Sequence, residues 1–120
     1  MTTFETSTIP LDVTAATSLS AVSATGSGTA WDNGFMRSNH SMVVTTSGTV
    51  TSGAVALQVS LDGSNWVTAP GAGATVSPLS ASAPVTLAVA SNVCARYVRA
   101  NVTTTIGGGG TITAVVSSCN

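Results

Sequence analysis

Aliphatic residues alternate with hydroxyl-bearing and other small residues along much of this chain, and a period of two is typical of half-buried β-strands. The alternation is clearest over residues 54–61, where every second position is aliphatic: Val55, Leu57, Val59 and Leu61. The same pattern predicts strands over residues 11–13, 18–24, 40–46, 66–69 and 85–90, with a short edge strand at 75–77. Gly, Ser and Pro separate these segments, as expected for turns between strands.

The C-terminal part of the chain carries two alternating segments separated by four glycines at residues 107–110. One segment places Val98, Ala100 and Val102 on a single face, and the other does the same with Ile112, Ala114 and Val116. Pairing residue 98 with 116, 100 with 114 and 102 with 112 keeps the aliphatic residues on one buried side. The pattern therefore predicts an antiparallel hairpin with the glycines as a flexible turn, and with Tyr97 and Arg99 on its opposite face.

Asp62-Gly63, between two alternating segments, is a strong signal for a tight turn, because glycine accepts the positive φ that such turns require. Two interpretations of the nearby side chains remain open. In the structural one, Asp62 binds the turn amides, while Trp66 packs on the sandwich with its indole N–H bonded to a carbonyl. In the functional one, Trp66 stacks on a sugar and Arg96 or Arg99 supplies hydrogen bonds. Arg99 beside Tyr97 is either a buried, paired guanidinium or an interface anchor.

Short strands joined by turns, with no helical pattern, predict an all-β fold: an antiparallel β-sandwich or jelly roll of about eight short strands. Residues 1–10 are expected to form an extended N-terminal arm, and residues 11–120 a single domain. Residues 25–39 are rich in Gly and Ser and are expected to form a long loop, and such loops are usually functional or disordered. The arm and this loop supply the candidate partner contacts Phe4, Trp31, Phe35 and Met36.

Charged residues make up 6% of the chain and include no lysine, whereas soluble surfaces ordinarily carry roughly a quarter to a third. Such a surface belongs either to a monomer hydrated by its Ser and Thr hydroxyls or, as we favour, to a component of an ordered assembly. The net charge of −1 and the absence of a basic stripe argue against a nucleic-acid partner. The sequence has no signal-peptide pattern and no long apolar run, so we expect synthesis in a cytoplasm and no membrane contact.

The residues that carry chemistry are sparse. His40 is the only imidazole, and the carboxylates show no local pairing, so neither hydrolase nor glycosidase chemistry is indicated and we expect no catalytic residue, metal or cofactor. Cys94 and Cys119 flank the predicted hairpin one residue out of step. They either form a disulfide across a bulge at its open end or remain two reduced thiols.

The segments 60–66 (SLDGSNW) and 95–99 (ARYVR) resemble two families. One is the galactose-binding, discoidin-like sandwich, although its final Glu-containing strand is absent here. The other is a group of small virion proteins of tailed bacteriophages, which is similar over roughly residues 40–117. The second resemblance implies a non-enzymatic capsid decoration protein, present in many copies on the outer head shell. The same resemblance implies binding to the major capsid protein and to copies of itself, with a trimer as the expected assembly. The alternatives are a carbohydrate-binding module and a tail or head-fibre component.

Overall fold

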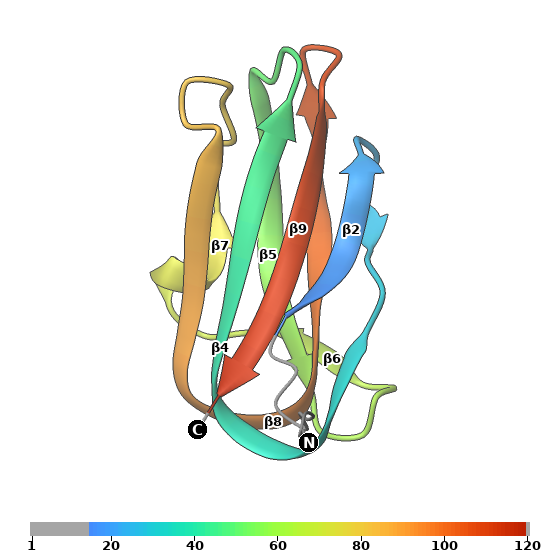
Figure 1. Cartoon of the computed structure of the whole chain (residues 1–120), viewed down its shortest axis with the longest axis vertical. Coiled ribbons are helices and arrows are strands. Elements are labelled where there is room, and N and C mark those ends of the chain that lie inside the picture. Colours follow the sequence, from blue (N-terminus) through green and yellow to red (C-terminus); the bar gives the residue numbers. More distant parts are fainter. Residues whose placement is uncertain (1–14, 120) are drawn as a thin grey trace, which may run out of the picture.

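A computed structural model describes residues 15–119 as an almost entirely β-stranded unit (Figure 1). Its strands are β2 (Ala16–Val22), β3 (Gly26–Ser27), β4 (Trp31–Ser47), β5 (Ser52–Ser60), β6 (Trp66–Thr68), β7 (Thr75–Val76), β8 (Val85–Gly107) and β9 (Thr111–Cys119). A short 3-10 helix, η1 (Ala72–Ala74), precedes β7. The all-β prediction is confirmed. The predicted arm at residues 1–10, which contains Phe4, and the strand predicted at 11–13 lie outside the described residues.

The strands form one antiparallel hydrogen-bonded set in the order β2-β9-β4-β8-β5-β6, with β3 added to β8 and β7 added to β5. This set folds over into two layers because β4 and β8 both bend at the same end of the molecule (Figure 1). The register of β4 shifts on either side of Arg37, and there β8 turns at residues 92–94. The first part of β8 and the second half of β4 therefore join β2 and β9 in the front layer. The remainder of β8 joins β3, β5, β6 and β7 in the rear layer.

The predicted sandwich is thus present, but two of its strands are not short: β4 has 17 residues and β8 has 23. Each is long because it passes through both layers. The core lies between the layers, and alternate residues of every long strand supply it. Its largest fully buried side chains are Met42, Leu57, Leu79, Ile112, Val44, Val55, Val98, Val102 and Val116. Each contributes about 1.5–3 kcal/mol when it leaves water.

The predicted C-terminal hairpin is wrong. Val98 pairs with Val59 of β5, whereas Val116 pairs with Met42 of β4 and Ala16 of β2. The predicted faces are buried on both strands, but they meet across the core from opposite layers. Alternation shows which side of a strand is buried and carries no information on which strand lies beside it. Residues 107–110 therefore form an arch between the layers.

The glycines of this arch permit close packing. Gly110 N–H donates to Thr49 O at 2.7 Å, and Thr51 N–H donates to Gly107 O at 3.0 Å. Gly108 has a φ of +99°, and an added Cβ would lie 2.7 Å from Thr49 O. The glycines are needed for positive φ and for contact with the neighbouring loop. The arch is a closely packed turn, contrary to the expectation of a flexible one.

The expectation of a long loop over residues 25–39 is also wrong. Residues 26–27 form β3, and β4 begins at Trp31, which pairs with Val98. The segment looked like a loop because glycine and polar residues interrupt its alternation. Gly34, with a φ of +82°, lies where the β4–β8 register is irregular, so the strand continues although the period does not.

Candidate functional site

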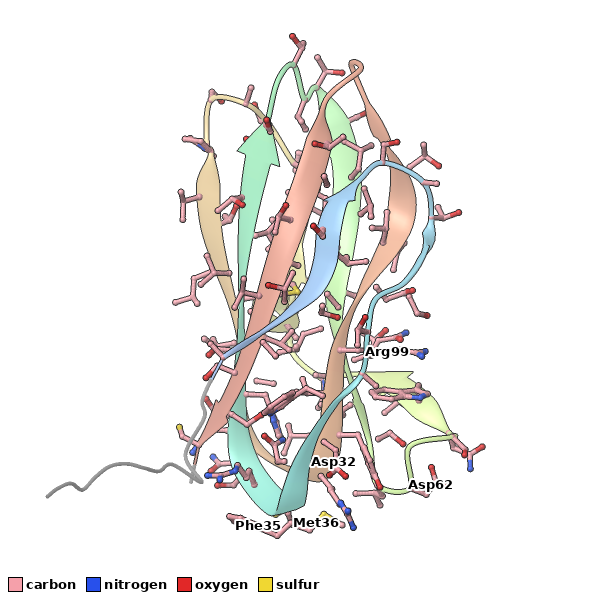
Figure 2. All side chains as sticks on the ribbon, turned by 45° about the vertical axis from the view of Figure 1, so that its right-hand side comes forward. Asp32, Phe35, Met36, Asp62 and Arg99 are labelled. Atoms are coloured by element: carbon pink, nitrogen blue, oxygen red, sulfur yellow. The ribbon has the colours of Figure 1, made fainter. Side chains whose placement is uncertain are left out.

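Charged side chains gather toward one end of the sandwich, where β4 and β8 pass between the layers (Figure 2). We call this the charged end. Within the described residues it holds Asp32, Arg37, Asp62, Arg96 and Arg99. The remaining length of both layers carries hydroxyl, amide and aliphatic side chains. Every functional candidate of the sequence that lies in the described residues is also found toward this end.

Asp32 and Arg96 form a two-point ion pair that joins β4 to β8. Arg96 Nε donates to Asp32 Oδ1 at 2.7 Å, and Arg96 Nη2 donates to Asp32 Oδ2 at 2.9 Å. Gly34 N–H also donates to Asp32 Oδ1, at 2.8 Å. The Arg96 hydrogen bonds, and then that of Gly34, hold the pKa of Asp32 below its ordinary value. Because the pair is exposed, it adds little to the free energy of unfolding, and its main effect is to hold β4 beside β8 at the bend.

Asp62 organises the turn between β5 and β6. Its Oδ1 accepts the Ser64 and Asn65 backbone N–H groups at 2.9 and 2.8 Å, and its Oδ2 accepts Asn65 Nδ2 at 2.7 Å. Ser60 Oγ donates to Oδ1 at 3.1 Å. The backbone bonds of Asn65 and Ser64 hold the pKa of Asp62 far below its ordinary value. With both oxygens committed to the turn, Asp62 serves as a structural acceptor.

Trp66 lies on the outer face of the rear layer and outside the core. It pairs with Ser60, and its indole N–H donates to Gly63 O at 3.2 Å. The guanidinium carbon of Arg99 lies 4.1 Å from the centroid of the indole. Arg99 Nε also donates to Gln58 Oε1 at 2.8 Å. Arg99 is therefore half-buried and paired, and it occupies one face of the ring on which a sugar would stack.

Tyr97 connects the turn to the ion pair. Its strand neighbours are Ser60 on β5 and Asp32 on β4. An added Cβ at Gly63 would lie 3.3 Å from the Tyr97 ring, so the turn rests on the phenol face. The guanidinium carbon of Arg96 lies 5.1 Å from the ring centroid. Tyr97 is thus a packing residue on the outer face of the rear layer.

The candidate partner contacts separate into two kinds. Trp31 is half-buried and packs against the core. Phe35 and Met36 are exposed at the tip of the charged end, where β4 bends (Figure 2). The guanidinium carbon of Arg37 lies 4.4 Å from the Phe35 ring centroid, and its buried Nε has no hydrogen-bond partner. Phe4 lies outside the described residues.

His40 belongs to a buried hydrogen-bond chain that the sequence did not predict. Asn33 Nδ2 donates to Ser118 Oγ at 3.1 Å, and Ser118 Oγ lies 2.7 Å from His40 Nδ1. His40 Nε2 lies 2.9 Å from Val93 O, so this nitrogen carries the proton and Nδ1 accepts from Ser118. Burial lowers the pKa of His40 and keeps it neutral. The third member of this hydrogen-bond chain is the Val93 carbonyl, whereas a catalytic triad has a carboxylate there. These hydrogen bonds therefore hold β4, β8 and β9 together and do not form a catalytic triad.

Both cysteines are free and exposed. The disulfide expectation rested on the hairpin register, and that register does not exist because β8 and β9 are not strand neighbours there. Near Cys94, a shallow and mainly apolar groove of about 380 Å³ runs between the Asp62 turn and the bend of β8. Within residues 15–119 no group of three or more His, Cys, Asp or Glu side chains could hold a metal ion. No helix there is long and apolar enough to cross a membrane.

Comparison with known proteins adds a fold relationship. No protein-family model and no curated protein sequence matches the chain. Among solved structures, the chain is similar to the crystal structure of the SPBc2 prophage-derived protein YomS, with a TM-score of 0.59 and 17% sequence identity. The similarity covers 88% of this chain and 92% of that one. Nearly the whole of this chain therefore has the fold of that prophage-derived protein.

Proposed function

We propose that this chain is a non-enzymatic structural protein of a bacteriophage virion, of the capsid decoration type. It binds the outer head shell in many copies and stabilises it, in contact with the major capsid protein and with copies of itself. It is made in the cytoplasm of the host. The fold shared with a prophage-derived protein supports the phage origin, and the surface described next supports the structural role.

The observation that carries the proposal is the outer face of the front layer, which we call the outer wall. The register aligns its outward residues in three rows across β8, β4 and β9: Val89, Ser41 and Ser117; Leu87, Val43 and Val115; Val85, Thr45 and Thr113. None of these residues is ionisable, and the middle row is entirely aliphatic. Depletion of charge is the signature of the centre of a protein interface. An uncharged wall of paired strands suits permanent contact within a shell.

The residues of the charged end support the same conclusion. Both carboxylates are already bound within the molecule, Asp62 by turn amides and Asp32 by Arg96. Arg99 over Trp66 likewise weakens the carbohydrate-binding alternative, because it covers one indole face. The exposed Phe35 and Met36 remain as a small apolar tip suited to a neighbouring subunit.

The test uses particles of the phage that encodes the chain. Gel densitometry of complete virions and of heads lacking tails is expected to show the chain in amounts comparable to the major shell protein. Heads stripped of the chain are expected to release DNA at lower temperature and to recover when purified protein is added back. A few copies per virion, or copies found only with tails, would contradict the decoration role.

A matched pair of variants then tests the outer wall. Val43→Lys places a charge in the middle row, while Val67→Lys places the same charge on β6 in the rear layer. We expect Val43→Lys to bind stripped heads at least about tenfold more weakly, and Val67→Lys to bind as the unmodified protein does. Equal binding of the two variants to stripped heads would show that the outer wall does not contact the shell.

A further inference from the structure

The first part of β8 is an open sheet edge. Within the described residues, residues 85–91 pair with β4 and with no second strand, whereas the later part of β8 has neighbours on both sides. This edge is the outermost strand of the front layer, at the left of Figure 1. An open edge presents unpaired N–H and C=O groups and is a template for pairing with another chain.

The backbone groups that point outward can be identified. Thr46 N–H donates to Pro84 O at 3.0 Å, so Pro84 faces β4. Because hydrogen-bonding direction alternates along an antiparallel strand, Val85, Leu87 and Val89 direct their N–H and C=O groups away from β4. The nitrogen of Pro84 that lacks a hydrogen also faces β4, so proline does not block the free edge.

The side chains on this edge are apolar and exposed. Val85, Leu87 and Val89 are 65%, 62% and 46% exposed, and they lie on the outer wall. Natural proteins protect open edges with lysine, other charges, bulges or covering segments. No charged residue occurs between residues 63 and 95. η1 packs beside the edge at Gly73, where an added Cβ would lie 3.7 Å from Val89 O, so Val85 and Leu87 are the most open part of the edge.

We infer that this edge binds the same edge of a second copy of the chain, in antiparallel register about a two-fold axis at Leu87. The five residues 85–89 read Val-Thr-Leu-Ala-Val, a pattern close to its own reverse. The axis sets Leu87 opposite Leu87 of the second copy and each Val85 opposite Val89. All three pairs are apolar, lie on the same face and bring outward-pointing backbone groups together. The two front layers thereby become one continuous sheet.

The absence of charge on the edge is compatible with a second copy of the chain and disfavours a charged partner. Residues 85–89 are neutral, so two copies meet along this edge without like-charge repulsion, whereas a charged partner finds no complement there. By the strand register, all charged groups of the described residues lie on the rear layer or at its bend, away from residues 85–89. A two-fold contact uses the same residues on both sides, and the near-palindromic segment 85–89 fits such a contact. The inference stands on this edge alone and does not depend on a role in a virion.

Cross-linking tests the register directly in the full-length chain with Cys94→Ser and Cys119→Ser. Hydrogen-bonded antiparallel partners have Cα atoms about 5.5 Å apart, within the range of a disulfide. Leu87→Cys is therefore expected to form a disulfide dimer under mild oxidation, and Val67→Cys, which is similarly exposed at 61%, is not. Val85→Cys mixed with Val89→Cys is expected to cross-link, and either one alone is not.

Sedimentation of the unmodified chain and of Leu87→Lys tests the energetics. The unmodified chain is expected to self-associate, and Leu87→Lys, which sets two charges face to face, to raise the dissociation constant at least about tenfold. Val67→Lys is the control and should associate normally. A monomer at the highest soluble concentration overturns the inference, as does association that Val67→Lys alone disrupts. Cross-linking of Leu87→Cys to Phe4→Cys instead of to itself also overturns it and assigns the edge to the N-terminal segment.

Discussion

The guanidinium of Arg99 lies over the indole ring of Trp66, with its central carbon 4.1 Å from the ring centroid. The same guanidinium donates from Nε to Gln58, which fixes its position on the outer face of the rear layer. This contact relates a side chain of β8 to one of β6 across the intervening strand β5. The guanidinium covers one face of the Trp66 ring, so that face is not free to stack on a ligand.

Arg99→Ala is expected to expose the indole of Trp66 and to lower the free energy of unfolding by about 0.5–1 kcal/mol, the contribution of an exposed cation–π contact. In a Trp31→Phe background, acrylamide quenching of Trp66 should increase. Arg37→Ala is the control, since Arg37 contacts Phe35 instead. Simple sugars should leave the emission of the unmodified chain unchanged. A saturable sugar response that Trp66→Ala abolishes while the fold persists would restore the carbohydrate-binding alternative.

Gly63→Ala tests the contact between the Asp62 turn and Tyr97. Gly63 has a φ of +80°, and an added Cβ would lie 3.3 Å from the Tyr97 ring. Gly34 has a φ of +82° and nothing within 4 Å of an added Cβ, so Gly34→Ala carries the backbone strain without the contact. Urea unfolding is expected to show a loss of about 1–2 kcal/mol for Gly34→Ala and a larger loss for Gly63→Ala. Equal losses would mean that the ring moves aside freely.

His40 is expected to make stability depend on pH. Burial lowers its pKa in the folded state, so the unfolded chain binds the proton more readily. Stability is therefore fully present above the ordinary pKa of about 6.5 and falls as pH decreases from there toward the folded value. Urea midpoints measured between about pH 7 and pH 5 should decline for the unmodified chain. His40→Gln should be less stable throughout, by about 1–3 kcal/mol, and should lack this slope. An unchanged slope in the variant would assign the titration elsewhere.

Cys94 and Cys119 are expected to react as two ordinary surface thiols. Because both are free and exposed, Ellman's reagent should modify both in the native protein without prior reduction. The variant with serine at both positions should unfold within about 0.5 kcal/mol of the unmodified chain, as surface substitutions usually do. An intact mass two hydrogens lower, with thiols appearing only after reduction, would show a disulfide instead.

The buried faces could be predicted from the sequence because alternation reports them directly. Val98, Ala100 and Val102 point into the core as their spacing predicts, and so do Ile112, Ala114 and Val116. Their neighbours could not be predicted, because a hairpin and an arch between two layers bury the same alternate residues. Here the glycines at 107–110 cross from one layer to the other. Whether these glycines form a hairpin or an arch depends on the strands that pair with β8 and β9, namely β5 and β4, and both lie far away in the sequence.

The candidate site divides in a similar way. The Asp62 turn could be predicted because its donors and acceptors lie within five residues of each other in the chain. The chain from Asn33 through Ser118 to His40 could not, because it joins two parts of β4 to the end of β9. Ser118 is one of 17 serines, and nothing local distinguishes it from the others. The strand that begins at Trp31 could not be predicted, because Gly34 and the register shifts around Arg37 interrupt its alternating pattern.

The passage of β4 and β8 through both layers has a mechanical consequence. In a sandwich of two independent sheets, only side-chain contacts oppose sliding of one sheet over the other. Here two continuous backbones cross the same end, so sliding must strain covalent chain or break ladder hydrogen bonds. A force applied at residues 85–91 is therefore transmitted along β8 into the rear layer. The two layers are thus joined by hydrogen-bonded strands at one end and by the loops at residues 48–51 and 107–110 at the other, and the molecule resists shear as a single folded sheet.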